Sequence, residues 1–235
     1  MPHRDKSLSS ERQPLVEVLR SSRWARGLTA PQLRRVETDV VELHFPIGAY
    51  VCRRGDPVDS WPGVVSGLVK LASVSATGKS VSFEGVTAGG WFGEGSLLKS
   101  EPRKYDAVAL RDSRIASMPR ATFVWLRANS IPFNHFLLDQ LNERLAYMIA
   151  ALESDRSRGP DARVAQCLAS FFNPQLCPWT DRALPISQEE IGHFSGLSRQ
   201  RVNHALKVLE RFGLLRVEHV GITVTDLGGL RRFVD

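Results

Sequence analysis

The stretch ISQEEIGHFSGLSRQRVNHALKVLERFGLLRVEHVGITV, residues Ile186–Val224, opens with the signature of a capped helix. Ser187 and Glu190 have the S-x-x-E spacing of a capping box. In that motif the serine hydroxyl accepts a hydrogen bond from the amide of the third helical residue, and the carboxylate accepts one from the serine amide. Gly196 supplies a left-handed stop. The stretch therefore predicts a short helix that ends at Ser195.

A second helix and two strands follow in the same stretch. Ser198 is placed to cap a helix that continues to Phe212 and ends at Gly213. Two helices joined by a short, glycine-containing turn make a helix-turn-helix. The runs Leu214–Val217 and Ile222–Val224 then predict two strands with a tight turn between them. Together these elements have the pattern of a winged helix, whose wing usually lies on the DNA backbone.

The second helix divides into an apolar face and a polar face. At about 100° per residue, one arc of the helix holds four apolar side chains, Val202, Ala205, Leu206 and Leu209. The Arg, Gln and Asn side chains on the opposite face have paired donors and acceptors that read purine edges in a major groove. A solvated polar face is the alternative, but the two caps and the residue chemistry favour DNA recognition. The residues that we expect to contact DNA are Ser198, Arg199, Gln200, Asn203 and His204.

Upstream, five apolar residues recur at intervals of three, four, three and four, which is the spacing of a coiled-coil seam. They are Leu138, Leu141, Leu145, Met148 and Leu152. The seam predicts a helix from about Phe133 to Arg156 and favours a homodimer interface over packing within one chain. Gly159-Pro160 ends that helix and supplies a hinge. Another helix is expected at Ala162–Phe172.

Between residues 40 and 119 the sequence has the pattern of short strands. Runs of β-branched residues are separated by glycine-containing turns such as Thr77-Gly78-Lys79. Many short strands at this spacing predict an antiparallel barrel, roll or jelly-roll-like sandwich. We expect strands at Val40–Phe45, Val64–Val74, Ser80–Val86, Ala107–Leu110 and Ser113–Met118. Residues 1–35 are polar with a short helical pattern and are expected to form a lead-in segment.

Composition and motif content exclude several classes of protein. The 235 residues carry a net charge of +6, which suits a polyanion such as DNA, although many enzymes have a similar excess. No apolar run of about eighteen residues and no signal-peptide core is present, so we expect a cytoplasmic protein with no membrane partner. Cys52, Cys167 and Cys177 are too scattered for a disulfide framework or a metal cluster. With no HExxH, GxSxG or P-loop motif, we expect no catalytic residues, no metal site and no enzyme.

Over nearly its whole length the chain resembles the Crp/Fnr superfamily of bacterial transcription regulators. The similar segments are Gly55–Pro57, Val65–Leu71, Trp91–Glu94, Ala165–Leu168 and Ile186–Leu215. The resemblance implies an α+β fold with an N-terminal antiparallel β-roll of the cyclic-nucleotide-binding type, a long dimerisation helix and a C-terminal winged helix-turn-helix. It also implies an effector-sensing β-roll domain at residues 1–130, the dimerisation helix and hinge at 131–158, and the DNA-binding domain at 159–235.

The resemblance further implies a phosphate cassette beginning at Gly93. In nucleotide-binding members of the family, the glutamate of a Gly-Glu pair holds the ribose hydroxyl and a following arginine neutralises the cyclic phosphate. Glu94 and Arg103 match these two positions, whereas Lys104 and the bulky Tyr105 replace the small residues that usually come next. The expected effector-binding residues are therefore Gly93, Glu94, Arg103 and Lys104.

The base half of the implied pocket departs from the family pattern. Cyclic-AMP sensors of the family set two small hydroxyl residues against adenine, where this chain has Met148 and Ile149. Leaving a purine amine unpaired costs about 1–3 kcal/mol. The cyclic-AMP mode is therefore disfavoured. A different anionic effector, such as another cyclic nucleotide or a cyclic dinucleotide like cyclic di-GMP, and the absence of any ligand are both left open.

Taken together, the sequence predicts a homodimeric, effector-controlled transcription regulator. Its expected partners are double-stranded promoter DNA, a second copy of the chain and RNA polymerase. A nucleotide-binding regulatory subunit that acts on a protein partner is the alternative, and the helix-turn-helix argues against it. Effector binding near Arg103 is expected to alter packing against the seam Leu141–Leu152 and to swing the DNA-binding domains about Gly159-Pro160.

Overall fold

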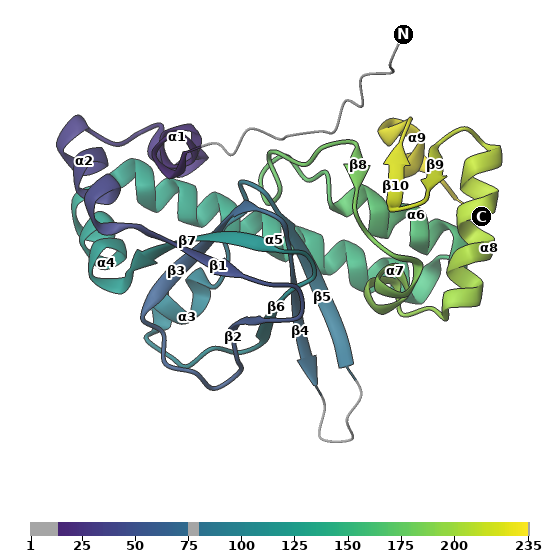
Figure 1. Cartoon of the computed structure of the whole chain (residues 1–235), viewed down its shortest axis with the longest axis horizontal. Helices are drawn as coiled ribbons and strands as arrows, with labels where there is room; N and C mark the ends of the chain where they lie inside the picture. Colours follow the sequence, from purple (N-terminus) through teal and green to yellow (C-terminus); the bar gives the residue numbers. More distant parts are fainter. Residues whose placement is uncertain (1–13, 75–79, 235) are drawn as a thin grey trace, which may run out of the picture.

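The computed structural model describes residues 14–74 and 80–234 (Figure 1). The described part begins with helical segments that pack at one end of the sheets, at α1 (Leu15–Ser21), η1 (Arg23–Ala25) and α2 (Ala30–Asp39). Thr29 and Gln32 form a capping box that starts α2. The lead-in segment is thus helical where it is described, and its residues 1–13 lie outside the described residues.

Two antiparallel sheets follow and form the predicted β-roll. One sheet has the order β1 (Val41–Phe45), β7 (Ser113–Pro119) and β3 (Ser60–Ser66). The other has the order β2 (Tyr50–Cys52), β6 (Asp106–Ala109), β4 (Leu68–Val74) and β5 (Ser80–Thr87). Every pairing within these sheets is antiparallel, which confirms the fold class predicted for this region.

The prediction of one strand at Val64–Val74 was wrong, because two strands occupy that run. Gly67, with a φ of +102°, separates β3 from β4, and each strand joins a different sheet. A Cβ at Gly67 would lie 2.8 Å from the Cα of Ser113, so the turn requires glycine for space as well as for its dihedral. The short strand β2 was not predicted, and the turn predicted at Thr77–Lys79 lies outside the described residues.

Aromatic side chains fill the core where the β-roll meets the helices. Trp24, Trp61 and Phe133 are almost fully buried, and their rings meet edge to face or tilted at centroid distances of 5.8–6.3 Å. Gly63 completes this packing, since a Cβ there would lie 2.4 Å from the ring of Trp91. Such pairs add directional attraction to the burial of large apolar area.

Two helices leave the β-roll, α4 (Arg120–Asn129) and the 27-residue α5 (Ile131–Ser157). The Ser130 hydroxyl caps α5 by accepting from the amide of Phe133 at 3.2 Å, and Pro132 occupies the first turn. The helix therefore begins two residues before the predicted start. Figure 1 shows α5 extending behind the sheets from the β-roll to the C-terminal elements.

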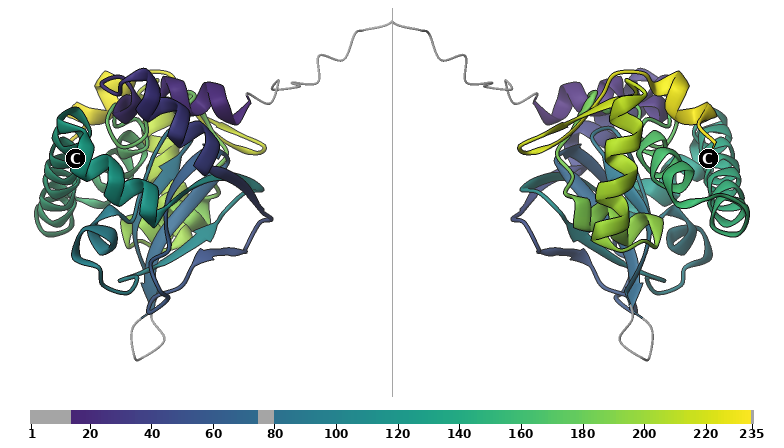
Figure 2. Two further views of the ribbon diagram at one scale, coloured as in Figure 1. Left: turned by 90° about the vertical axis from the view of Figure 1, so that its left-hand side faces the viewer. Right: turned by 90° about the vertical axis from the view of Figure 1, so that its right-hand side faces the viewer.

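The C-terminal region is the predicted winged helix-turn-helix. Its elements are α6 (Pro160–Ser170), β8 (Ala183–Leu184), α7 (Gln188–Ser195), α8 (Arg199–Arg211), β9 (Leu215–Glu218), β10 (Gly221–Val224) and α9 (Leu227–Arg232). The strands β9 and β10 form the wing and pair with β8 in the order β8-β10-β9. In the right-hand view of Figure 2, α8 faces the viewer along the outer end of the molecule.

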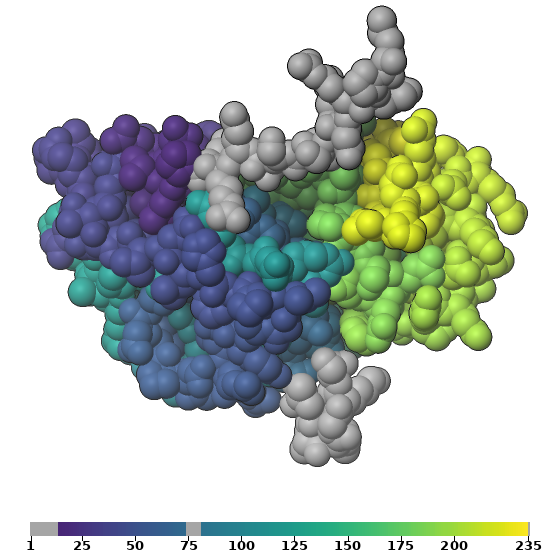
Figure 3. Space-filling view, viewed as in Figure 1, coloured from purple at the N-terminus to yellow at the C-terminus, as the bar shows by residue number. Residues whose placement is uncertain are grey.

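The C-terminal region packs directly on the β-roll, so that the two form adjoining lobes in Figure 3. Leu68 and Leu110 of the β-roll belong to the same apolar cluster as the core of the winged helix. Phe171 covers Gly85 of β5 so closely that a Cβ at Gly85 would lie 2.2 Å from its ring. In the part of the chain that the structure describes, no helix is long and apolar enough to cross a membrane.

Candidate functional site

The helix-turn-helix is built by the caps that the sequence predicts. The Ser187 hydroxyl accepts from the amide of Glu190 at 3.2 Å, and the Glu190 carboxylate accepts from the amide of Ser187 at 2.6 Å. Gly196 ends α7 in the left-handed region, with a φ of +67°. Ser198 then caps α8 by accepting from the amide of Arg201 at 3.3 Å. These bonds satisfy helix-terminal groups that would otherwise lack partners.

The two faces of α8 lie as the sequence predicts. The four residues of the apolar face are 0% exposed, namely Val202, Ala205, Leu206 and Leu209. Ser198, Arg199, Gln200 and His204 are exposed, while Asn203 is half-buried at the margin of the polar face. The structure therefore brings the five predicted DNA-contacting residues to the N-terminal half of one exposed helix.

The wing adds residues that helix periodicity alone does not place. A hollow of about 320 Å³ lies between the beginning of α7, the beginning of α8 and the wing. Gln188, Arg199 and His219 line it together, although they come from three separate elements. Arg216 of β9 is also exposed. The sequence signal for His219 was its position in the predicted wing turn, but its closeness to Gln188 follows only from the fold.

The predicted phosphate cassette forms a pocket of about 220 Å³ against α5. Gly93, in the left-handed region with a φ of +82°, precedes the short helix α3 (Glu94–Lys99). Glu94 is 1% exposed and lines the pocket. Lys104 lines it from the other side, and its ammonium lies 2.8 Å from the carboxylate of Glu101.

Arg103 faces the backbone of the cassette. Its guanidinium donates to the carbonyl of Gly93 at 3.3 Å and to the carbonyl of Ser60 at 2.5 Å. A Cβ at Gly93 would lie 2.2 Å from Nη1 of Arg103, so the glycine makes room for the arginine. The buried Arg103 side chain therefore links the cassette to the start of β3 through these two hydrogen bonds. It lies next to the pocket that Lys104 lines but is not part of the pocket lining.

A buried charge cluster at the wall of this pocket was not predicted from the sequence. Arg144 of α5 lies between Glu84 of β5 and Glu94, with nitrogen to oxygen distances of 3.5 and 3.6 Å. It also donates to the carbonyl of Trp91 at 3.1 Å. Neither carboxylate oxygen of Glu84 accepts a hydrogen bond from a described residue, so the ion pair with Arg144 is its compensating interaction. The available sequence signals were an arginine directly beside the heptad seam and a glutamate inside a predicted strand.

Burial dominates the acid-base behaviour of this cluster. Desolvation raises the pKa of Glu84, and the neighbouring Glu94 raises it further, while Arg144 opposes the shift. For Arg144, desolvation alone would lower the pKa, but Glu84 and Glu94 raise it above its ordinary value. Two carboxylates thus share one guanidinium in a poorly solvated space, which links the β-roll and the cassette to α5.

The seam of α5 is a solvent-facing apolar stripe. Leu138, Leu145 and Leu152 are 65, 58 and 52% exposed, and Met148 is 37% exposed. Ile149 extends the stripe at 58% exposed. Leu141 differs from the other predicted seam residues because it is half-buried and lines the cassette pocket. The structure places the seam where a second chain has access to it, and one seam residue also contacts the pocket.

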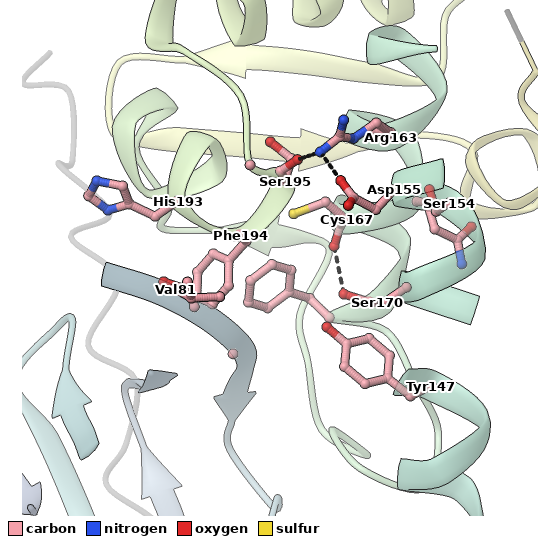
Figure 4. Close-up of a pocket in the computed structure, with 16 residues that line it drawn as sticks. Val81, Tyr147, Ser154, Asp155, Arg163, Cys167, Ser170, His193, Phe194 and Ser195 are labelled. Atoms are coloured by element: carbon pink, nitrogen blue, oxygen red, sulfur yellow. Dashed lines mark hydrogen bonds and ion pairs between the residues drawn. The ribbon is translucent and has the colours of Figure 1, made fainter. Parts of the chain in front are cut away.

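A third cavity, of about 380 Å³, lies where β5, α5, α6 and α7 meet (Figure 4). Arg163 crosses one side of it, bonded to the carbonyl of Ser195 at 2.6 Å and to the carboxylate of Asp155 at 2.5 Å. Cys167 lies on the same wall, and burial raises the pKa of its thiol to about 12. Residues of the β-roll, of α5 and of the beginning of the DNA-binding region therefore all line this cavity.

Comparison with known families accounts for both halves of the chain. The cyclic nucleotide-binding domain family matches residues 42–130, which span the sheets and the cassette. The Crp-like helix-turn-helix domain family matches residues 143–233, from the middle of α5 to the last helix. The chain belongs to the Crp/Fnr superfamily. The Crp-like helix-turn-helix match and the relatives described below are those of transcription regulators.

Members of the Crp/Fnr superfamily from several bacteria align with most of the chain. The CRP-like cAMP-activated global transcriptional regulator of Mycobacterium tuberculosis is 27% identical over 220 residues, which cover 92% of this chain and 98% of that protein. The nitrogen fixation regulation protein FixK of Bradyrhizobium diazoefficiens is 24% identical over 214 residues, covering 89% of this chain and 88% of that protein.

Solved structures of the superfamily share the fold. FixK2 from Bradyrhizobium japonicum superposes with a TM-score of 0.71 at 19% identity, covering 83% of this chain and 98% of that chain. The c-di-GMP responsive global regulator CLP of Xanthomonas campestris gives a TM-score of 0.61 at 21% identity, covering 83% of this chain and 99% of that chain. At these identities the likeness establishes the arrangement of the β-roll, long helix and winged helix.

Proposed function

We propose that the protein is a homodimeric transcription regulator that reads promoter DNA with α8 and is controlled by a small anionic effector at the cassette. The observation that supports DNA reading is the arrangement of α8. The apolar face of α8 is fully buried in the core of the winged helix. The side chains of Arg199, Gln200 and His204, in the N-terminal half of α8, are exposed to solvent. An arginine fork pairs with guanine, and glutamine pairs with adenine, in a major groove. RNA polymerase is a further expected partner, and the cytoplasm is the expected location.

Homodimerisation is supported by the exposed stripe of α5. Leu138, Leu145 and Leu152 are more than half exposed, yet they follow one heptad seam. A monomer would leave this contiguous apolar surface in water, whereas pairing with a second α5 would bury it. The pairing also sets two recognition helices about a two-fold axis, which is the arrangement needed for a symmetric operator.

Effector control is supported by the form of the cassette pocket. Glu94 is buried with one carboxylate oxygen that has no hydrogen-bond partner among the described residues. Such an acceptor suits a hydroxyl of a sugar. An anionic effector would engage Lys104 at the pocket wall and draw Arg103 from its carbonyl partners. One relative is described as cAMP-activated and one structural neighbour as c-di-GMP responsive, so both nucleotide classes are reasonable probes.

The pocket is connected to α5, which gives the effector a route to the DNA-binding region. Leu141 and Arg144 of α5 both line the pocket. A ligand that moves either residue would shift the helix that carries the proposed dimer stripe and that ends at the hinge Gly159-Pro160. The expected mechanism is a shift between two populations of domain arrangement.

DNA binding and effector binding are tested separately. Selection from a random duplex library should enrich a two-fold symmetric site with half-sites about one helical turn apart. Failure to enrich any sequence would contradict the DNA-reading role. Calorimetry with cyclic AMP, cyclic GMP and cyclic di-GMP should show saturable binding of at least one probe other than cyclic AMP. Absence of heat with all three would contradict nucleotide control.

A further inference from the structure

The first helix of the helix-turn-helix is tied to the β-roll by a two-pronged ion pair. Arg111 lies in the turn between β6 and β7, and its Nη1 and Nη2 donate to the two carboxylate oxygens of Glu190 at 2.8 and 2.9 Å. The two side chains are only 27 and 17% exposed. A two-pronged arginine–carboxylate pair fixes orientation as well as distance.

Glu190 is also part of the frame of α7, because the same carboxylate accepts from the amide of Ser187. Burial alone would raise the pKa of Glu190, but the bonds from Arg111 and Ser187 lower it below its ordinary value. At the other partner, Arg111 donates to the carbonyl of its neighbour Leu110, and Leu110 packs in the apolar cluster of the winged helix. The pair therefore joins the capping box of α7 to the turn between β6 and β7 that carries Leu110.

Apolar packing does not fix α7 along its whole length. Although α7 contacts β5, a cavity of about 380 Å³ lies beside that contact, lined by the C-terminal end of α7 together with β5, α5 and α6 (Figure 4). At its C-terminal end, α7 is held through the carbonyl of Ser195 by Arg163 of the neighbouring helix α6. At its N-terminal end it is held to the β-roll by Arg111. A change at Arg111 would leave α7 attached to its own domain but less constrained toward the β-roll.

We propose that Arg111 is a positioning residue for DNA binding, which sets the orientation of the helix-turn-helix relative to the β-roll through Glu190. The proposal rests on the proposed function of the protein as a homodimeric DNA-binding regulator. In a dimer built along α5, the orientation of each domain determines the separation of the two α8 helices. That separation corresponds to the spacing of half-sites on the duplex. Arg111 thus selects operator spacing and leaves base reading within each half-site to α8.

Four single variants separate this role from helix capping. Arg111→Gln removes the charge, and Arg111→Lys keeps the charge but loses the fork. Glu190→Gln preserves a capping box, since glutamine also serves at that position, but removes the ion pair. Ser187→Ala is the matched control, because it removes the side-chain cap and leaves Arg111 and Glu190 in place.

The assay is binding of each full-length variant, at fixed salt, to duplexes with identical half-sites and stepped spacing. The wild type should prefer one spacing, and Arg111→Gln and Glu190→Gln should each reduce that preference by at least about fivefold, the lower end of ordinary coupling between sites. Arg111→Lys should retain part of the wild-type spacing preference, because it keeps the positive charge. Ser187→Ala should keep the wild-type preference, and base preference within the half-site should be unchanged in all variants.

The outcomes distinguish this inference from the function on which it rests. Wild-type spacing preference in both Arg111→Gln and Glu190→Gln overturns the positioning role while the regulator itself stands. Equal loss in Ser187→Ala also overturns it, because capping would then explain the effect. If the wild type binds no symmetric duplex as a dimer, the proposed function fails and the inference fails with it. Should Arg111→Gln fold poorly, Glu190→Gln and Arg111→Lys decide the question.

Discussion

Replacing Arg144 with methionine removes the guanidinium that two buried carboxylates share. The side chains of Arg144, Glu84 and Glu94 are 15, 5 and 2% exposed, so water replaces the lost partner poorly. Methionine fills much of the space of the aliphatic part of arginine, which limits the loss of packing. The variant therefore isolates the electrostatic role of the guanidinium.

We expect Arg144→Met to lower the free energy of unfolding by about 3–5 kcal/mol at pH 7, the usual cost of breaking a buried ion pair from one side. The lost hydrogen bond to the carbonyl of Trp91 is included in that figure. Adding Glu84→Gln should recover a large part of the loss, because Glu94 then no longer faces a second buried carboxylate. Glu84→Gln alone should be close to neutral, since it leaves one guanidinium with one carboxylate.

The loss should depend on pH in a definite direction. Burial already raises the folded-state pKa of Glu84, and removal of Arg144 raises it further. A carboxyl group whose folded pKa exceeds its unfolded pKa destabilises the fold progressively as pH rises from the unfolded value, about 4.3, to the folded value. The deficit of Arg144→Met should thus be smaller at pH 5 than at pH 7.

Urea unfolding followed by tryptophan fluorescence measures these differences, at one protein concentration because association contributes to stability. Arg156→Met, an exposed position on the same helix, is the matched control and should change stability by less than about 0.5 kcal/mol. A deficit below about 1 kcal/mol at pH 7, or one that neither pH 5 nor Glu84→Gln reduces, would refute the shared-guanidinium reasoning.

Three further changes test the dimer stripe, the cassette and the contact between lobes. Leu145→Glu should convert the protein to a monomer in sedimentation, because two carboxylates would face each other across the seam, and an unchanged mass would contradict the interface. Arg103→Ala should abolish the response of DNA binding to effector in a titrated gel shift while basal binding persists, and a normal response would contradict its role. Gly85→Ala should speed proteolysis near Gly159, because its Cβ would lie 2.2 Å from Phe171, whereas Gly95→Ala, with open space around it, should not. Equal cleavage rates would show that this contact does not hold the lobes together.

The helices and strands were largely predictable because their signals are local. The capping box at Ser187, the stop at Gly196 and the cap at Ser198 each act over three or four residues, and all three are formed. The heptad seam likewise predicted α5 to within two residues at its start. The division of Val64–Val74 at Gly67 was missed because the neighbouring Ser113, which forces that turn, is distant in sequence.

The candidate site was only partly predictable for the same reason. Glu94 and Lys104 were expected from the resemblance to the family's phosphate cassette, and both line the pocket. The burial of Arg103 against Ser60 and the sharing of Arg144 by two carboxylates depend on contacts between distant segments. No spacing rule in one sequence gives those contacts, since they arise when β5, the cassette and α5 are packed together.

The most direct test of DNA reading by α8 is binding-site selection at fixed salt with the wild type, Arg199→Ala and Arg216→Ala. Arg199→Ala should weaken binding to the preferred site by about 1–3 kcal/mol and relax preference at one base pair in each half-site. Arg216→Ala, in the wing, should weaken binding to all sequences alike through a lost phosphate contact. If Arg199→Ala instead lowers the affinity for all sequences equally and leaves the selected sequence unchanged, α8 does not read bases through Arg199. That result would contradict sequence-specific DNA recognition by α8.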